Sequence, residues 1–440
     1  MKTKFFVNGF WSLLNQGIRV GSIALIMILL SRHFGPQRFG SLAVGFALVR
    51  IFAVVATFGL DRIVVRHLVE QSDSRADILR QAFCLKLGIA CASYLALIGF
   101  VFVFQRDDAL LLRIVASAGG GLFFQAFDVY DYGFQANGRF GFSFLGRSLP
   151  ILLSAGIKLG AILIGAPLII FAVLETIESA FIAMALYLIN RRIPNARTTL
   201  RPKIFWPRFL AEGLPLLLSA LAVMIYMRSD VILLGKMIGY EAAGVYAAAA
   251  QISETCALLP VALMPALFPL LVRWRRSGSE FYLRKVERLF LFAVLGGLVF
   301  SIFLTIGAPV ITDFIFGPSY HTAAGILAVH GWTLVFIFIG IAQSGYDVTE
   351  HLTWIATSRM VVGAVLNIAL NLFLIPRFGA IGSAIATLVA QIFSAVLLNA
   401  LHPATRPILR MQVGAILIWP ALRALARDRQ SSENRAWLPA

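Results

Sequence analysis

The chain is dominated by apolar segments long enough to cross a membrane. Covering roughly 30 Å of hydrocarbon takes about 20 helical residues. Twelve segments approach or exceed that length, near residues 8–31, 40–60, 79–104, 109–133, 141–165, 167–189, 208–234, 242–272, 286–307, 323–346, 352–375 and 379–401. Because lipid offers the backbone no hydrogen-bond partner, each segment must be a helix. The sequence therefore predicts an all-α, multi-pass membrane protein.

Composition supports this class and excludes others. Hydrophobic residues fill 59% of the 440 positions and charged residues only 13%, against about a quarter charged in soluble domains. The net charge of +17 comes from basic residues scattered between apolar runs, so we expect no nucleic-acid partner. Cys84, Cys91 and Cys256 fall inside predicted spans. They are too few for a disulfide framework, and we expect them to be small packing residues.

Lysine and arginine are concentrated in alternate loops. One set of loops holds Lys2, Lys4, Arg62, Arg66, Arg75, Arg80, Arg139, Arg191, Arg192, Arg197, Arg201, Lys203, Arg208, Arg273, Arg275, Arg276, Arg284, Lys285 and the arginine-rich tail. The other holds little beyond Arg32, Arg38, Arg106, Lys236 and Arg377. This imbalance predicts that both termini are cytoplasmic. The run from Arg410 to Arg427 is too short to span and is expected at the membrane interface.

The sequence also contains an internal repeat. GPQRFGSLAVG at 35–45 and GYEAAGVYAAA at 239–249 share a pair of glycines opening an apolar helix, at an offset of about 204 residues. The offset contains six predicted spans, so the two copies would be parallel repeats. We therefore predict two six-helix bundles around a central cavity. The bundles would be residues 1–190 and 208–402, joined by a basic cytoplasmic linker at 191–207 and followed by a basic cytoplasmic tail at 403–440.

Polar residues form stripes on several predicted spans. In the first span, Asn8, Trp11, Asn15, Arg19 and Ser22 recur every three or four residues and share one helical face. Comparable sets are Gln125, Asp128, Asp131, Tyr132 and Gln135; Glu175, Glu178 and Ser179; Ser219, Tyr226 and Asp230; Gln251, Glu254 and Thr255; and Arg359, Asn367 and Asn371. Amides, hydroxyls and aromatic rings that converge in this way suit a sugar.

Several cations lie at membrane depth: Arg19, Arg50, Lys158 and Arg147, with Arg228 near a span end. Guanidinium groups bind phosphate bidentately, which gives a reason to keep them there despite their cost. The expected cargo is thus an anion that carries carbohydrate. We take as candidate cavity residues Arg19, Arg50, Asn15, Lys158, Gln125, Asp128, Asp131 and Tyr226.

Two alternatives stay open at this point. Arg147, Arg228 and Arg359 are near helix ends and could extend to the membrane interface. Asp128, Asp131 and Glu178 could instead be partners of other helices. At the repeat offset Arg50 falls opposite Glu254, so a charge pair between the bundles is a hypothesis for a gate.

Four stretches, in this order along the chain, resemble the polysaccharide transport family. They run from Asn8-Gly9-Phe10-Trp11 through LLSRHFGPQRFGSLAV, from RSDVILLGKMIGYEAAGVYAAAAQI into LLPVALMPALFPLL, over FGPSYHTAA at 316–324, and over NIALNLFLIPRFGAIGSAIATLVAQ at 367–391. This family contains the O-antigen and exopolysaccharide lipid-carrier flippases and belongs to the multidrug/oligosaccharidyl-lipid/polysaccharide exporter superfamily. Twelve spans argue against a close match to the fourteen-helix peptidoglycan-precursor flippase.

The resemblance implies a flippase that moves an undecaprenyl-pyrophosphate-linked oligosaccharide from the cytoplasmic to the periplasmic leaflet of the bacterial inner membrane by alternating access. It implies lumen roles for Arg19 and Arg50, and it matches Asp230 to the acidic residue of a family signature. Polysaccharide polymerase and glycosyltransferases would be pathway partners. Some relatives use a proton or sodium gradient. Candidates for coupling or gating are Asp230, Glu254, Glu175 and Glu178. No other cofactor is implied.

Other classes fit less well. A membrane enzyme acting on lipid-linked sugars would need long external loops, and the predicted external loops are short. An ion-coupled multidrug exporter of the same superfamily would have a more apolar or acidic cavity. An ATP-driven pump would need a phosphate-binding GxxxxGK[ST] loop, and the sequence has none. We therefore expect a transporter and not an enzyme.

Overall fold

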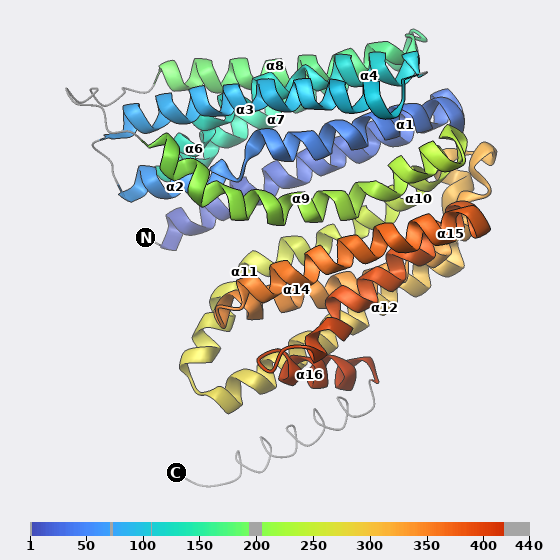
Figure 1. Cartoon of the computed structure of the whole chain (residues 1–440). Coiled ribbons are helices and arrows are strands. Elements are labelled where there is room, and N and C mark those ends of the chain that lie inside the picture. The colour runs from blue at the N-terminus through green and yellow to red at the C-terminus, as the bar shows by residue number, and fades with distance from the viewer. Residues whose placement is uncertain (1, 71–73, 107, 193–204, 418–440) are drawn as a thin grey trace, which may run out of the picture. The chain divides into compact units, whose positions relative to one another are not determined.

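The computed structural model describes residues 2–70, 74–106, 108–192 and 205–417, and within these ranges the chain contains helices and no strand. Figure 1 shows long helices running side by side along most of their length. The all-α prediction is confirmed. The elements are α1 (Lys2–Thr57), α2 (Leu60–Glu70), α3 (Arg75–Phe104), α4 (Ala109–Gly119), α5 (Gly121–Phe124), η2 (Gln125–Phe127), α6 (Asp128–Ala136), α7 (Phe140–Leu163), α8 (Leu168–Arg191), α9 (Trp206–Met237), α10 (Tyr240–Cys256), α11 (Leu258–Arg276), α12 (Ser279–Phe316), η3 (Pro318–Tyr320), α13 (Ala323–His330), α14 (Thr333–Thr349), α15 (Thr353–Ala395), η4 (Leu397–Ala400) and α16 (Arg406–Ile416).

In the described residues, ten helical segments are long and apolar enough to span a membrane. Two of them are bent, α1 at Gly35 (φ 71°) and α15 at Gly379 (φ 60°), where glycine adopts a positive φ that other residues rarely reach. Each bend separates two predicted spans, so the ten segments correspond to the twelve predicted spans. The predicted span at 242–272 is divided between α10 and α11. Pro260 accounts for that break, because its ring clashes with the carbonyl four residues earlier, at Cys256.

The chain divides into two compact units, and each is described by itself. The first comprises Met1–Ala248 with Ile315–Ser319, and the second Ala249–Phe314 with Tyr320–Ala440. This division does not follow the predicted linker at 191–207. Helix α9, which we assigned to the C-terminal bundle, packs along α1 and against α2 in the first unit. The two-bundle organisation around a cavity stays a prediction, and residues 193–204 of the linker and 418–440 of the tail lie outside the described residues.

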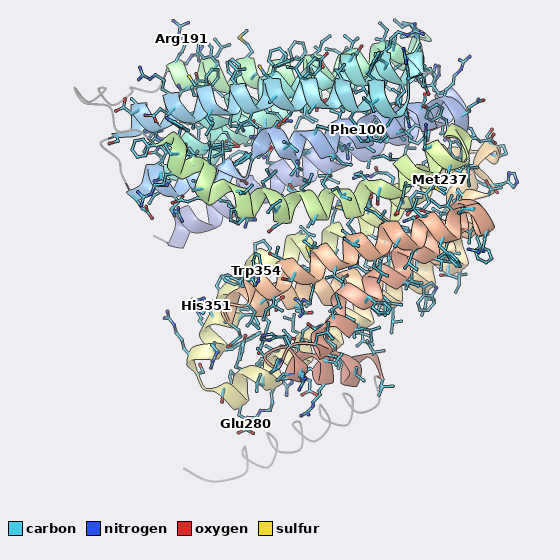
Figure 2. All side chains as sticks on the ribbon, in the orientation of Figure 1. Phe100, Arg191, Met237, Glu280, His351 and Trp354 are labelled. Carbon is cyan, nitrogen blue, oxygen red and sulfur yellow. The ribbon has the colours of Figure 1, made fainter. Side chains whose placement is uncertain are left out.

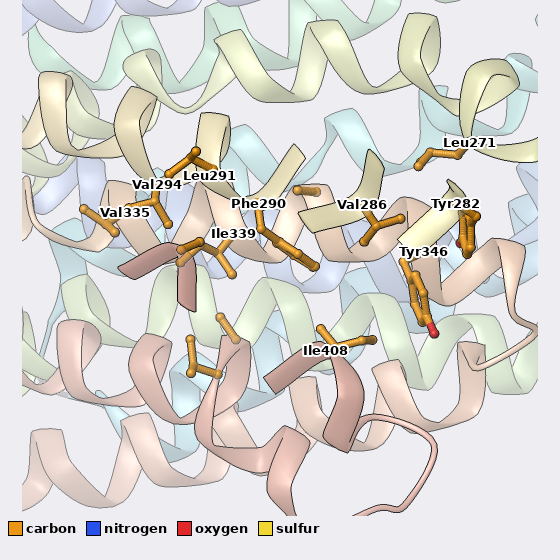
Figure 3. Close-up of a cluster of buried hydrophobic side chains, with 14 residues drawn as sticks. Leu271, Tyr282, Val286, Phe290, Leu291, Val294, Val335, Ile339, Tyr346 and Ile408 are labelled. Carbon is orange, nitrogen blue, oxygen red and sulfur yellow. The ribbon is translucent and has the colours of Figure 1, made fainter. Parts of the chain in front are cut away.

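Each unit has its own apolar core. In the first, α2 buries Leu60, Ile63 and Val64 against Ile78 of α3 and Phe209 of α9. Helix α2 is amphipathic, so only this face is buried, while its charged residues stay exposed. In the second unit, side chains of α12 and α14 interdigitate, as Figure 3 shows, and the rings of Tyr282 and Tyr346 stack with centroids 5.8 Å apart.

The outward faces of the long helices are apolar. Phe100 on α3 and Trp354 on α15 extend from the helices in Figure 2, and they are 38% and 74% exposed. Such faces are what a helix presents to lipid. Cys84 and Cys91 also lie on the exposed face of α3, whereas Cys256 is half-buried. The expectation that cysteines serve as packing residues is therefore wrong for Cys84 and Cys91.

The two copies of the repeated motif pack against each other within the first unit. Gly40 of α1 lies so close to α10 that an added Cβ would overlap the carbonyl oxygen of Tyr240, and a Cβ on Gly244 would overlap that of Pro36. Around this contact, the Tyr240 hydroxyl donates to Asp108, and Lys236 Nζ donates to the carbonyl of Phe104 at 2.9 Å. The second position of each copy must therefore be glycine, because the backbones approach too closely there for a Cβ atom.

Candidate functional site

A cluster of charged side chains lies between α3, α6 and α7 in the first unit. We call it the Arg147 cluster and define it as Lys86, Asp128, Asp131, Tyr132 and Arg147. Asp128 and Asp131 are three residues apart at the start of α6, so both face α7. Arg147 joins them, with Nε 2.7 Å from Asp131 Oδ2 and Nη2 2.9 Å from Asp128 Oδ1. The two carboxylates are therefore partners of another helix, which was one of the two open interpretations, and Arg147 is held inside the unit.

Lys86 completes the cluster from the α3 side, and sequence reasoning missed it. Its side chain is fully buried, with Nζ 2.9 Å from the Tyr132 hydroxyl and 3.7 Å from Asp128 Oδ2. The ammonium also lies 5.0 Å from the centroid of the Tyr132 ring. A buried ammonium is costly without a counter-charge, so Asp128 is needed by Lys86 as well as by Arg147. One lysine in the middle of an apolar span was the available signal.

Exposure changes across the cluster. The side chains of Arg147 and Asp128 are 27% and 19% exposed, but that of Asp131 is only 2% exposed. Asp131 Oδ2 also accepts a hydrogen bond from Gln135 Nε2 at 3.0 Å, which fixes this carboxylate further. One arm of Arg147 is thus bonded to a buried carboxylate and the other to a partly exposed one.

The polar face predicted on the first span packs against α7, on both sides of Arg147 in the sequence. Asn15 accepts a hydrogen bond from the Ser148 hydroxyl of α7 at 2.8 Å, and the ring of Trp11 lies 4.8 Å from that of Phe144. Arg19 is exposed and donates to Gln16 at 2.9 Å. It lies one turn after Asn15, which is bonded to Ser148 next to Arg147 in the chain, and it forms no ion pair with any described residue. The side chain of Asn8 lies outside the described residues.

A second charged group joins α7 to α8. Lys158 Nζ lies 2.9 Å from Glu175 Oε1 and 2.8 Å from Glu178 Oε2, and Ser154 donates to the same Glu178 oxygen at 2.7 Å. Lys158 is 7% exposed at its side chain, whereas Glu175 is 41% exposed. Lys158 is therefore neutralised by two carboxylates, and the group carries one net negative charge. This arrangement suits a cation or proton better than a phosphate.

The remaining candidates are spread over both units. Gln125 accepts a long hydrogen bond of 3.4 Å from Thr57, and Asp230 is buried and accepts from the Tyr246 hydroxyl at 2.6 Å. Tyr226 lies one turn before Asp230 on α9 and is half-buried. Arg50 belongs to the first unit and Glu254 to the second, so their pairing as a gate stays a prediction.

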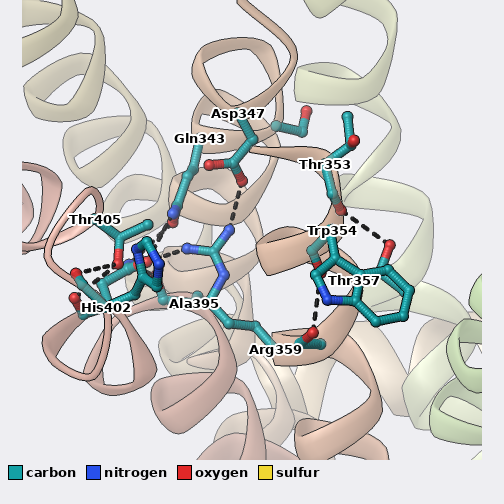
Figure 4. A network of polar contacts seen from close by, with 12 residues as sticks. Gln343, Asp347, Thr353, Trp354, Thr357, Arg359, Ala395, His402 and Thr405 are labelled. Carbon is teal, nitrogen blue, oxygen red and sulfur yellow. Dashed lines mark hydrogen bonds and ion pairs between the residues drawn. The ribbon is translucent and has the colours of Figure 1, made fainter. Parts of the chain in front are cut away.

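The second unit contains a buried polar network around Arg359. Its guanidinium forms an ion pair with Asp347 and donates to the Asn399 amide oxygen, as Figure 4 shows for the Asp347 arm. The amides of Gln343, Asn399 and Gln412 bond to one another at 2.8–3.2 Å. Arg359 therefore does not extend to the membrane interface, which was one open interpretation; it joins α14, α15, η4 and α16.

Asn367 and Asn371 also face the interior of the second unit. Asn371 accepts from the Ser383 hydroxyl at 2.7 Å, and Asn367 donates to Thr387 at 3.2 Å. These bonds connect the two arms of α15 on either side of the bend at Gly379. The polar residues that were predicted to align here thus bond the two arms of one bent helix to each other.

The fold places the chain in a known class of membrane proteins. It is similar to a solved structure described as lipid II flippase MurJ in the inward closed conformation, with a TM-score of 0.69 and 15% identity, covering 94% of this chain and 91% of that one. It is also similar to a multidrug resistance MATE family transporter of the MOP superfamily in the inward-facing conformation, with a TM-score of 0.67 and 15% identity. That match covers 94% of this chain and 96% of the transporter chain. The chain therefore has the MurJ/MATE-like helical fold.

Sequence comparison then gives the family. The model of the polysaccharide biosynthesis protein family matches residues 5–274, which is more than half of the chain, so the protein belongs to that family. A curated relative, "Probable flippase AglR" of Haloferax volcanii, is 28% identical over 394 residues, covering 85% of this chain and 78% of the relative. The resemblance noted from the motifs is confirmed.

Proposed function

We propose that this protein is a flippase for oligosaccharide linked to a polyprenyl diphosphate, with undecaprenyl pyrophosphate as the carrier. Family membership and the names of the relatives support flippase activity. The observation that carries the substrate class is Arg19, an exposed guanidinium within a membrane-spanning helix, with no carboxylate partner among the described residues. Keeping such a group in a span is costly unless an anion binds it.

The proposed transport direction follows the loop charges. The basic loops would lie in the cytoplasm of a bacterial cell with both termini, so the substrate would enter from the inner leaflet of the inner membrane and leave at the periplasmic leaflet. Two six-helix bundles would expose the substrate site alternately to each side. Whether the polymer is O-antigen or an exopolysaccharide depends on the sugar, and Asn15, Gln125 and Tyr226 are the proposed sugar contacts. Arg50 is the second proposed phosphate ligand.

The energy source we propose is an ion gradient acting through a membrane carboxylate. Glu175 and Glu178 share Lys158 in the first unit, and Glu175 is 41% exposed at its side chain. Asp230 is buried and bonded to Tyr246. Protonation of a carboxylate, or binding of a sodium ion to it, would change these contacts and could bias one conformation. Glu254 is the fourth candidate.

A deletion strain tests the proposal. We expect lipid-linked oligosaccharide to accumulate at the cytoplasmic leaflet, and polymer export to fall. The wild-type gene should restore export, but Arg19→Ala and Arg50→Ala should not. Arg377→Ala is the matched control, because Arg377 is exposed and donates only to the carbonyl of Phe373 in its own helix. Normal export in the deletion strain would overturn the proposal.

The likeness to MATE transporters favours one second candidate, an ion-coupled multidrug exporter. The same strain separates the two functions. A multidrug exporter predicts increased sensitivity to lipophilic cations with normal polymer export, whereas the flippase predicts the opposite pattern. An enzyme acting on lipid-linked sugars would instead leave a chemically altered lipid-linked intermediate, which mass spectrometry of the extracted lipids detects.

A further inference from the structure

Arg147 has two carboxylate partners that differ in accessibility. Its Nε is bonded to Asp131, whose side chain is 2% exposed, and its Nη2 is bonded to Asp128, whose side chain is 19% exposed. Nη1 forms no hydrogen bond to any described residue. A guanidinium has five N–H donors in a planar fork, so Arg147 keeps donors that no described residue uses.

The ion pairs of the Arg147 cluster do not include Arg19. Lys86 and Arg147 pair with Asp128 and Asp131. Arg19 lies one turn after Asn15, which is bonded to Ser148 next to Arg147 in the chain, so the like charges of Arg19 and Arg147 repel each other. An anion that binds both guanidinium groups would remove this repulsion. Of these two arginines, Asp128 is bonded only to Arg147. Its single charge therefore does not remove the repulsion between Arg19 and Arg147.

Asp128 would not be left without a counter-charge if Arg147 moved away. Its other oxygen lies 3.7 Å from Lys86 Nζ, a distance that a small side-chain movement could shorten to a direct hydrogen bond. Lys86 is fully buried and bonded to Tyr132, so it stays beside Asp128. Breaking a buried ion pair is costly mainly because one charge is left alone. Here the second cation avoids that cost.

We propose that Asp128 occupies the place of a phosphate in the empty transporter and releases one arm of Arg147 when a diphosphate binds between Arg147 and Arg19. This inference rests on the proposed flippase function and assigns three further roles. Arg147 is a phosphate ligand, Asp128 is its exchangeable counter-anion, and Asp131 is the fixed anchor that keeps Arg147 in position. Lys86 is a positioning residue that compensates Asp128 after the exchange.

The exchange gives a basis for selectivity. A diphosphate that links two groups carries two negative charges, whereas the headgroup phosphate of an ordinary phospholipid carries one. A single charge has no advantage over the carboxylate that it must displace, but two charges can bind two guanidinium groups at once. The Arg147 cluster would therefore reject bulk phospholipid and accept the diphosphate of a carrier lipid.

Calorimetric titration of the purified full-length protein with inorganic pyrophosphate tests the exchange. Asp128→Asn removes the competing charge and keeps the shape, so we expect pyrophosphate to bind about tenfold more tightly. Asp131→Asn is the matched control. It removes the anchor of Arg147, and we expect weaker binding together with a lower melting temperature. Dimethyl phosphate, with one negative charge, should bind Asp128→Asn measurably and the wild type poorly.

The outcomes separate this inference from the proposed function. If the wild type binds pyrophosphate, Arg19→Ala weakens binding, and Asp128→Asn leaves the affinity unchanged or lowers it, only the exchange is overturned. If the wild type binds no pyrophosphate, the substrate class fails as well. Should Asp128→Asn not fold, Asp128→Ser removes the same charge and is tested in the same way. Failure of both to fold would make Asp128 structural and overturn the exchange.

Discussion

Arg147 and Arg359 form similar ion pairs in the two units but differ in access to solvent. Arg147 is 27% exposed at its side chain and bonds two carboxylates. Arg359 is 9% exposed, bonds one carboxylate, Asp347, whose side chain is 4% exposed, and is further bonded to the Asn399 amide. The first arginine can exchange a partner with a ligand from solution. The second is enclosed by the neutral amides of Gln343, Asn399 and Gln412, which belong to α14, η4 and α16, so it can only hold these elements to its own helix.

An arginine within a membrane span can therefore have one of two uses. Where solvent reaches the ion pair, breaking it is inexpensive because water and a ligand replace the lost partner. Where solvent is excluded, removal of one partner leaves an uncompensated charge. Exposure of the pair, more than its presence, therefore decides which arginine serves function and which serves stability.

The largest expected loss of stability comes from breaking the Arg359–Asp347 ion pair. Arg359→Met leaves Asp347 buried without its partner and should lower the free energy of unfolding by about 3–5 kcal/mol. Thermal unfolding in detergent measures this. The double variant Arg359→Met with Asp347→Leu removes both charges and should recover part of the loss. A melting temperature of Arg359→Met equal to that of the wild type would mean that the Arg359–Asp347 pair does not stabilise the fold.

Removing the ion pairs of Arg147 should lower the free energy of unfolding less than removing the Arg359–Asp347 pair does. It should weaken ligand binding more. The double variant Arg147→Met with Asp131→Asn removes the cation together with the buried carboxylate that anchors it and leaves Asp128 beside Lys86, so we expect a loss of about 1–3 kcal/mol in unfolding free energy. Pyrophosphate binding should be abolished, which titration calorimetry detects. If this double variant destabilises the protein as much as Arg359→Met does, the distinction between exchangeable and fixed arginines is wrong.

Gln412 is a neutral member of the network around Arg359. Gln412 of α16 donates to Gln343 at 2.8 Å and to the Ala395 carbonyl at 3.1 Å. Gln412→Ala should cost about 1 kcal/mol in unfolding free energy. The affinity for pyrophosphate should not change, because the network around Arg359 does not bind ligand. A change in affinity at unchanged stability would contradict this.

The smallest effect on stability is expected at Arg19. It is exposed, and its one described hydrogen bond goes to Gln16 in the same helix. Arg19→Ala should change the unfolding free energy by no more than about 0.5 kcal/mol. Binding of pyrophosphate should nevertheless weaken. A large loss of stability in this variant would mean that Arg19 has a structural role.

Much of the fold could be predicted from the sequence, since span length and hydropathy are local properties. The bend at Gly35 was also marked locally, by the Gly35-Pro36 pair at the start of the repeated motif. The division into compact units was not visible. Helix α9 has the same apolar character whichever bundle it joins, and only its contacts with α1 assign it.

The candidate site was less accessible to prediction because charge pairing is a tertiary property. Asp128, Asp131 and Arg147 were recognised as polar residues in spans, but their pairing depends on how α6 meets α7. The enclosure of Arg359 depends on α16, where Ile408 and Gln412 are buried although the predicted tail showed no sign of packing. Residues 418–427, the rest of the predicted interfacial run, lie outside the described residues.

The close approach of Gly40 and Gly244 makes the contact between α1 and α10 reciprocal. A Cβ on Gly40 would meet the backbone of Tyr240 and Gly244, and a Cβ on Gly244 would meet that of Pro36 and Gly40. Isologous dimers associate through reciprocal contacts of this kind between two subunits. Here one chain supplies both sides, so the contact forms without an association step.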